Sequence, residues 1–68
     1  MNNLAKARES VGLTQYQLGE AVGRTQNSIS YYELGMRKPS LFTARQIVKK
    51  LNELGADVSL DDIFPAEI

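Results

Sequence analysis

Apolar residues in this 68-residue chain recur at intervals of three and four positions, and no stretch alternates cleanly between apolar and polar residues. Intervals of three and four place side chains on one side of a helix, whereas strict alternation is typical of a strand. The first such stripe consists of Leu4, Ala7, Arg8 and Val11. It predicts a first helix that runs to about Ser10 and stops before Gly12.

Hydroxyl and glycine residues divide the rest of the chain into four further helices. Serine and threonine side chains accept hydrogen bonds from the free N–H groups of a helix's first turn, and glycine often ends a helix. The expected first-turn caps are Thr14 with Gln17, Thr25, Ser40, and Ser59 with Asp62. Gly23 ends the second helix, residues 35–39 form a loop, and residues 55–57 interrupt the chain again. The prediction is an all-α bundle of five helices.

The apolar stripes also predict which residues of the later helices face the core. They are Leu18, Ala21 and Val22; Ile29, Tyr32, Glu33 and Met36; and Ala44, Ile47, Val48 and Leu51, while the last short turn bears Leu60, Ile63 and Phe64.

Two charged residues lie on these inner stripes, Arg8 in the first helix and Glu33 in the third. An isolated buried charge is very unfavourable, so we expect the two side chains to form an ion pair. The alternative is that the first helix ends sooner and the Arg8 side chain reaches out to water.

The composition narrows the classes of function. The chain has no cysteine and no histidine, which excludes disulfides, zinc sites built from these ligands, and catalysis by Cys or His. A hydrophobic content of 43% is enough for one packed core, while no apolar run approaches the ~20 residues of a membrane span. We therefore expect one cytoplasmic domain over residues 1–68, with no enzymatic activity, cofactor, metal, small-molecule ligand or membrane association.

The second and third helices are separated only by residues 23–25. So short a link, with glycine at its head, predicts a sharp crossing of the two helices. Gly19 lies near the crossing, where a missing side chain lets the helices approach closely. A generic pair of antiparallel helices is the alternative interpretation of this segment alone.

The third helix has a second, outward face of uncharged hydrogen-bonding residues, namely Gln26, Asn27, Ser30 and Tyr31. Such side chains suit the donors and acceptors of base edges in a major groove, and Gln or Asn can bond adenine in a bidentate manner. A helix exposed only to water more often carries Lys and Glu. We expect these four residues to read bases; a merely solvated polar face is the alternative.

Basic residues flank this face, Arg24 before the third helix and Arg37 and Lys38 after it. Phosphate contacts are expected to flank base contacts in this way. The free N–H groups at the helix N-termini near Gln15 and Gln26 add phosphate sites, and we expect Gln15 and Ser28 to contact phosphates as well. The whole chain is neutral, but five basic and three acidic residues give residues 1–38 a charge of +2 and leave −2 on residues 39–68. The charge signal for nucleic acid is weak.

The run TQYQLGEAVGRTQNSISYYE, from Thr14 to Glu33, resembles the helix-turn-helix of the Cro/phage-repressor (XRE) family. The segments KPS at residues 38–40 and VSLDDIF at residues 58–64 are similar to that family's downstream landmarks, so the resemblance covers residues 4–64. It implies five helices with the third in the major groove. It also implies a phosphate contact for Gln15, base contacts for Gln26, Asn27 and Tyr31, and a salt bridge between Arg8 and Glu33.

The chain departs from the family pattern in three respects. Gly19 stands where members usually have alanine, about five residues near 53–57 lengthen the link after the fourth helix, and the overall charge is low for a DNA-binding protein. The low charge bears on affinity, because phosphate contacts supply much of it.

These observations favour a small Cro-like regulator of phage or bacterial type that binds double-stranded DNA and represses by occupying an operator. So short a chain leaves no room for a ligand-sensing domain, although it could be one domain of a longer regulator. The alternative is a protein-interaction module, such as an antitoxin that masks a toxin. Exposed apolar residues concentrated near the acidic C-terminus would favour that alternative.

One recognition helix covers only a few base pairs, and the family binds as two-fold dimers on palindromic operators with recognition helices ~34 Å apart. We expect a homodimer whose interface uses Leu54, Val58 and Phe64, with further apolar area from Pro65 and Ile68. Leu60 and Ile63 are expected in the core instead. The alternative is a monomer that dimerises only on DNA.

Overall fold

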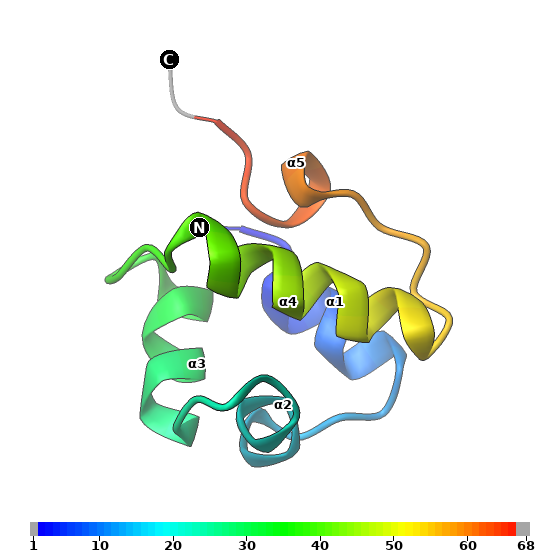
Figure 1. Ribbon diagram of the computed structural model, residues 1–68, viewed down its shortest axis with the longest axis horizontal. Coiled ribbons are helices and arrows are strands. Elements are labelled where there is room, and N and C mark those ends of the chain that lie inside the picture. The colour runs from blue at the N-terminus through cyan, green and yellow to red at the C-terminus, as the bar shows by residue number, and fades with distance from the viewer. Residues whose placement is uncertain (1, 67–68) are drawn as a thin grey trace.

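Five helices joined by short loops make up residues 2–66, the part of the chain that the computed structural model describes (Figure 1). They are α1 (Leu4–Ser10), α2 (Gln15–Val22), α3 (Gln26–Leu34), α4 (Leu41–Glu53) and α5 (Leu60–Ile63). In Figure 1, α4 crosses the centre, with α3 to its left, α2 below it and α5 above it. The described residues contain no strand, and the predicted all-α, five-helix fold is confirmed.

Each predicted cap forms. The hydroxyl oxygens of Thr14, Thr25, Ser40 and Ser59 accept a hydrogen bond from the backbone N–H three residues on. At α2 and α5 the bond is reciprocal, since the side chains of Gln17 and Asp62 accept from the N–H of the capping residue. These local bonds set where the helices begin, which is why the sequence located their first residues closely.

The core takes one or two fully buried side chains from every helix, namely Leu4, Leu18, Ile29, Ile47, Leu51 and Ile63. No helix here is long enough to be stable alone, so burial of these side chains against one another is what holds the helices in place. None of the helices in residues 2–66 is long and apolar enough to cross a bilayer.

Two residues expected in the core are exposed, and a third, Leu60, is half-buried and not part of the core cluster. Ala21 is exposed because the buried side of α2 is centred on Leu18 and Gly19. Met36 is 71% exposed because α3 ends at Leu34, two residues before the helical stripe would have turned it inward.

The longer link after α4 is held by a side chain. The Asn52 amide donates to the Val58 carbonyl (2.8 Å), and its oxygen accepts from the Val58 N–H (2.7 Å). Asp57, just before, has a φ of 55°, a left-handed conformation that Asp tolerates better than most residues. The link thus returns the chain to the core, where α5 packs on α4.

Candidate nucleic-acid interface

The turn between α2 and α3 is too tight for a side chain at Gly19. Gly23 ends α2 in the left-handed conformation (φ 71°), and the Arg24 N–H then donates to the Gly19 carbonyl at 2.8 Å. A Cβ atom on Gly19 would lie 2.6 Å from the Arg24 carbonyl oxygen and 3.2 Å from backbone atoms of Thr25. The missing side chain therefore lets α2 lie directly against the turn that leads into α3.

The two sides of α3 differ sharply. Ile29, Tyr32 and Glu33 are buried and hold the helix to the core. On the outward side, Gln26, Asn27 and Tyr31 are exposed, and Ser30 is half-buried. The structure thus places three of the four predicted base-reading side chains in the open, on a helix that lies at the edge of the molecule (Figure 1).

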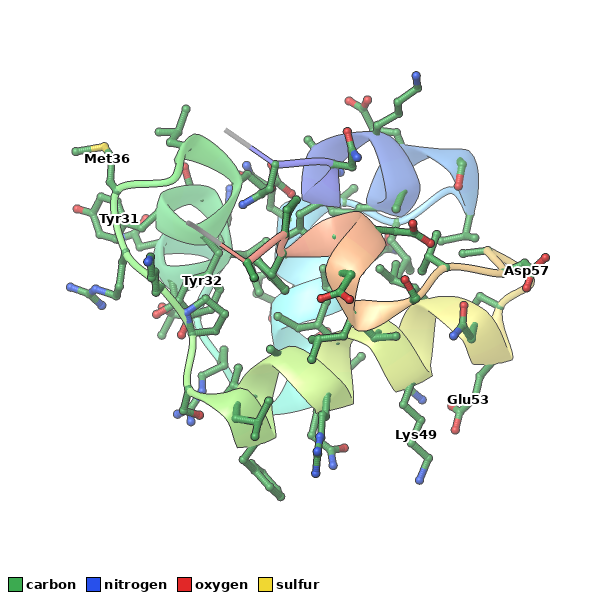
Figure 2. All side chains as sticks on the ribbon, turned by 90° about the horizontal axis from the view of Figure 1, so that it is seen from above. Tyr31, Tyr32, Met36, Lys49, Glu53 and Asp57 are labelled. Carbon is green, nitrogen blue, oxygen red and sulfur yellow. The ribbon has the colours of Figure 1, made fainter. Side chains whose placement is uncertain are left out.

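Tyr31 has a neighbour that the sequence did not indicate. The Arg37 guanidinium carbon lies 5.2 Å from the centre of the Tyr31 ring, within the range of a cation–π interaction. Figure 2 shows Tyr31 and Met36 together at one end of the molecule.

The predicted phosphate-contacting cations lie at the two ends of α3, and all three are exposed, namely Arg24, Arg37 and Lys38. Arg24 is also tied to α4, since its Nη2 donates to the Thr43 hydroxyl at 3.0 Å. That bond directs the guanidinium along the start of α4. Thr43 is buried, and nothing in the apolar pattern distinguished it.

Gln15 and Ser28, the other predicted phosphate contacts, are half-buried and already bonded within the protein. Gln15 Nε2 donates to Glu33 Oε1 at 2.9 Å, and Ser28 Oγ accepts from the Thr25 hydroxyl at 3.1 Å. The backbone N–H of Ser28 also bonds Thr25. The phosphate contacts of Gln15 and Ser28 remain predictions. To bind a phosphate, each side chain would have to share its present hydrogen-bond partner or exchange it for the phosphate.

The two charged residues of the inner stripes lie together. Arg8 Nε is 2.6 Å and Nη2 3.4 Å from the two Glu33 oxygens, and Arg8 Nη1 donates to the Leu13 carbonyl at 2.6 Å. Arg8 is only 9% exposed and Glu33 only 7%. With Gln15 as a third member, this network joins α1, the start of α2 and the last turn of α3, so it holds α3 to the two helices before it.

A shallow hollow lies between α2 and the start of α3, lined by Tyr16, Glu20, Arg24, Thr25, Gln26 and Asn27. The Tyr16 hydroxyl donates to the Glu20 carboxylate at 3.2 Å, and this bond together with the carboxylate charge raises the pKa of Tyr16. Sequence patterning did not single out Tyr16, because a lone aromatic residue in the first turn of a helix fits a core stripe as well as a surface.

A second hollow, of about 600 Å³, lies where the loop after α3 meets α4 and α5. Its walls are mostly apolar and include Pro39, Leu41, Ala44, Leu60, Phe64 and Pro65, with Arg37 and Lys38 along one side.

The three predicted interface residues have different surroundings. Leu54 is 48% exposed at the end of α4, whereas Val58 and Phe64 are half-buried and pack against the core. Ile63 is fully buried and Leu60 half-buried. Ile68 lies outside the described residues. Within residues 2–66, no three acidic, His or Cys side chains gather in a way that could hold a metal ion.

Comparison with known proteins agrees with this geometry. The family model described as "Helix-turn-helix" matches residues 4–58. An uncharacterised HTH-type transcriptional regulator of Methanothermobacter thermautotrophicus is 39% identical over 57 residues, which cover 84% of this chain and 77% of the relative. No solved structure matches the chain significantly. The capped α2, the tight turn at residues 23–25 and the half-exposed α3 are thus the parts of a shared motif, and the chain belongs to the Cro/C1-type (XRE) helix-turn-helix family.

Proposed function

We propose that this protein is a transcriptional regulator that binds double-stranded DNA in a sequence-specific manner, with α3 in the major groove. One observation carries the proposal: α3 is anchored to the core on one side and offers Gln26, Asn27 and Tyr31 on the other. Uncharged side chains of this kind can match donors and acceptors of particular base pairs, and a major groove admits a helix. The printed name of the archaeal relative, an HTH-type transcriptional regulator, supports the same function.

We propose further that the protein acts in the cytoplasm as a repressor, by occupying its operator. A molecule 31 Å long covers about nine base pairs per protomer at 3.4 Å per base pair. Bound within a promoter, two such protomers would cover enough DNA to exclude RNA polymerase. Repression then needs no contact with the polymerase itself.

The functional unit we propose is a two-fold dimer on a palindromic operator, in which each protomer seats a second copy at the hollow beside Phe64. The apolar walls suit a protein partner, and Arg37 and Lys38 are the charged residues of the lining.

Geometry favours this hollow over the Leu54 end of the molecule. Glu53 and Asp57, which flank Leu54 in sequence, lie at the opposite end from Tyr31 (Figure 2). The molecule is 31 Å long, so a dimer joined there would separate its recognition helices by nearly two molecular lengths. Successive major grooves on one side of DNA are only ~34 Å apart.

The exposed apolar residues do not favour an antitoxin. Within residues 2–66 the exposed large hydrophobic side chains are Tyr16, Tyr31, Leu34, Met36, Leu41, Phe42 and Leu54. Leu41, Phe42 and Leu54 belong to the acidic residues 39–68, but Leu41 and Phe42 lie at the start of α4 and the other four lie earlier in the chain. The exposed apolar side chains are thus not concentrated near the C-terminus, where a toxin-masking module is expected to have them.

The test is selection of bound fragments from a genomic DNA library, followed by footprinting and a salt titration of the site. We expect a protected palindrome and a steep loss of affinity with salt. The double variant Q26A/N27A serves as control, and it should keep the fold and the salt dependence but lose the preferred site. Equal affinity of the wild-type protein for all fragments would contradict sequence-specific binding.

A further inference from the structure

The chain after α3 folds back over the outward face of that helix. The backbone N–H groups of Met36 and Arg37 both point at the Tyr31 carbonyl, at 3.0 and 3.4 Å. These bonds close the C-terminal turn of α3 and bring the residue at position 37 above the one at position 31. As a result the Arg37 guanidinium carbon lies 5.2 Å from the centre of the Tyr31 ring.

Tyr31 needs such support if it is to read a base. The ring is 39% exposed, and its hydroxyl has no hydrogen-bond partner within residues 2–66. An exposed tyrosine ring can rotate about its first side-chain torsion, and each rotamer carries the hydroxyl to a different place. A cation held against the ring restricts that rotation, and the attraction strengthens when water is excluded, as it would be in a groove.

We infer that Arg37 is a positioning residue for base recognition, which holds the Tyr31 ring so that its hydroxyl meets one particular base pair. The inference rests on the proposed function and deepens it. Its basis is the cation–π contact itself, which patterning of the sequence did not reveal. Arg37 was expected to act only as a phosphate contact, and its charge can still do so, because the N–H groups of a guanidinium remain able to donate while it lies against a ring. Arg37 thus links a contact with the DNA phosphates to recognition of a base by Tyr31.

The test compares three variants on a panel of operators that differ from the selected site by one base pair at a time. In Y31F the ring stays and the hydroxyl is lost, so discrimination at one base pair should fall by roughly 5- to 100-fold. In R37K the charge stays but the planar group is lost. Discrimination should fall several-fold at the same base pair, while the slope of affinity against salt stays unchanged. The double variant R37K/Y31F should lose no more discrimination than Y31F alone.

Two results would overturn the inference. If R37K keeps full discrimination at every position, Arg37 acts through its charge alone. If R37K loses discrimination at positions that Y31F does not affect, Arg37 does not act through Tyr31. Thermal melts check that all variants fold, which we expect because both side chains are exposed.

A measurement on the free protein separates this inference from the function on which it rests. The Arg37 side-chain protons should show an upfield ring-current shift in the NMR spectrum that disappears in Y31L. Absence of that shift in the wild-type protein would overturn the contact directly. A clear shift in a protein that binds no DNA site would instead overturn the proposed function, and the role of Arg37 with it.

Discussion

The Glu33 carboxylate accepts hydrogen bonds from two other helices, from Arg8 in α1 and from Gln15 in α2. The guanidinium of Arg8 in turn donates to the Leu13 carbonyl, in the loop between those helices. Every polar side-chain atom buried in the described residues has a partner, so the network is complete. A complete buried network can fix one arrangement of its elements, which here is the position of α3 relative to α1 and α2.

Replacing either member of the buried ion pair should therefore destabilise the protein strongly. R8A or E33A leaves one charge buried without its partner, and we expect a loss of ~3–5 kcal/mol in the free energy of unfolding. Thermal and urea melts measure it. K6A, on the exposed side of the same helix, is the control and should change little.

A double change of Arg8 and Glu33 to apolar residues of similar size should recover much of the loss, since no charge is then stranded. Strictly additive single and double effects would mean that the two residues do not interact energetically.

Gln26 and Asn27 should act on specificity rather than on general affinity. Because both are exposed in the first turn of α3, Q26A or N27A should weaken binding to the selected operator by ~1–3 kcal/mol and relax discrimination at one base-pair position. Fluorescence anisotropy with single-base variants of the operator measures this. An equal loss of affinity for all DNA sequences would mean that the side chain contacts the DNA backbone and not a base.

At the level of elements, the arrangement of α2 and α3 depends on the close contact between Gly19 and the turn after α2, which helix propensity alone would not predict. Gly is less favourable than Ala inside a helix by ~1 kcal/mol, and family members usually have Ala at this place in α2. Here the position faces the Arg24 carbonyl, with no room for a methyl group. The turn at residues 23–25 therefore lies closer to α2 than an alanine would permit.

G19A should accordingly destabilise the protein, by about 1–3 kcal/mol, because overpacking outweighs the gain in helix propensity. It should also weaken DNA binding, since the turn sets the direction of α3. Urea melts of G19A and of A21G, an exposed position on the same helix, test this. A21G should cost about 1 kcal/mol through propensity alone. If G19A is more stable than the wild-type protein, the turn does not lie so close to α2 that it excludes a side chain at residue 19.

At the level of the whole molecule, the neutral chain separates its charges in space. Arg24 and Lys38 are exposed at the two ends of α3, whereas Asp61 and Asp62 lie on α5, and Glu53 and Asp57 lie at and just after the end of α4. A neutral molecule can thus still offer a basic face to phosphates. Its affinity should be more sensitive to the loss of single cations than that of a strongly basic protein.

R24A and K38A should each weaken binding to all DNA sequences and reduce the slope of log affinity against log salt by about one unit. K49A removes a charge at a place well away from Tyr31 (Figure 2) and is the matched control. If the slope of log affinity against log salt stays the same in R24A or K38A, the replaced residue does not contact a phosphate.

Dimer formation should depend on one end of the molecule and not on the other. Leu41 lines the hollow beside Phe64 and is 57% exposed, so L41D should abolish cooperative binding to the palindrome while the melting temperature at low concentration barely changes. L54D, at the far end of α4, is the matched control. V58D discriminates less well, because Val58 packs against the core and its loss affects the monomer itself.

The opposite result, in which L54D abolishes cooperativity and L41D leaves it intact, would place the interface at the end of α4. Sedimentation at several concentrations shows whether the dimer forms before DNA is bound.

The sequence by itself determined the helices, their first residues and the motif. Caps such as Thr14 and Ser59 act within three residues, and apolar stripes need only the period of the helix, so both can be read locally. The family resemblance added the order of the elements and the face of α3 that points outward. For that reason the all-α fold and the helix-turn-helix family could be predicted without coordinates.

Tertiary structure alone decided what each surface residue contacts. Met36 and Ala21 matched a stripe yet are exposed, because the end of α3 and the narrow buried side of α2 are set by packing with other helices. The bond from Gln15 to Glu33 and the contact of Arg37 with Tyr31 depend on distances between side chains. A helical period cannot specify such distances, because it gives the direction in which a residue leaves its own helix but not what lies there.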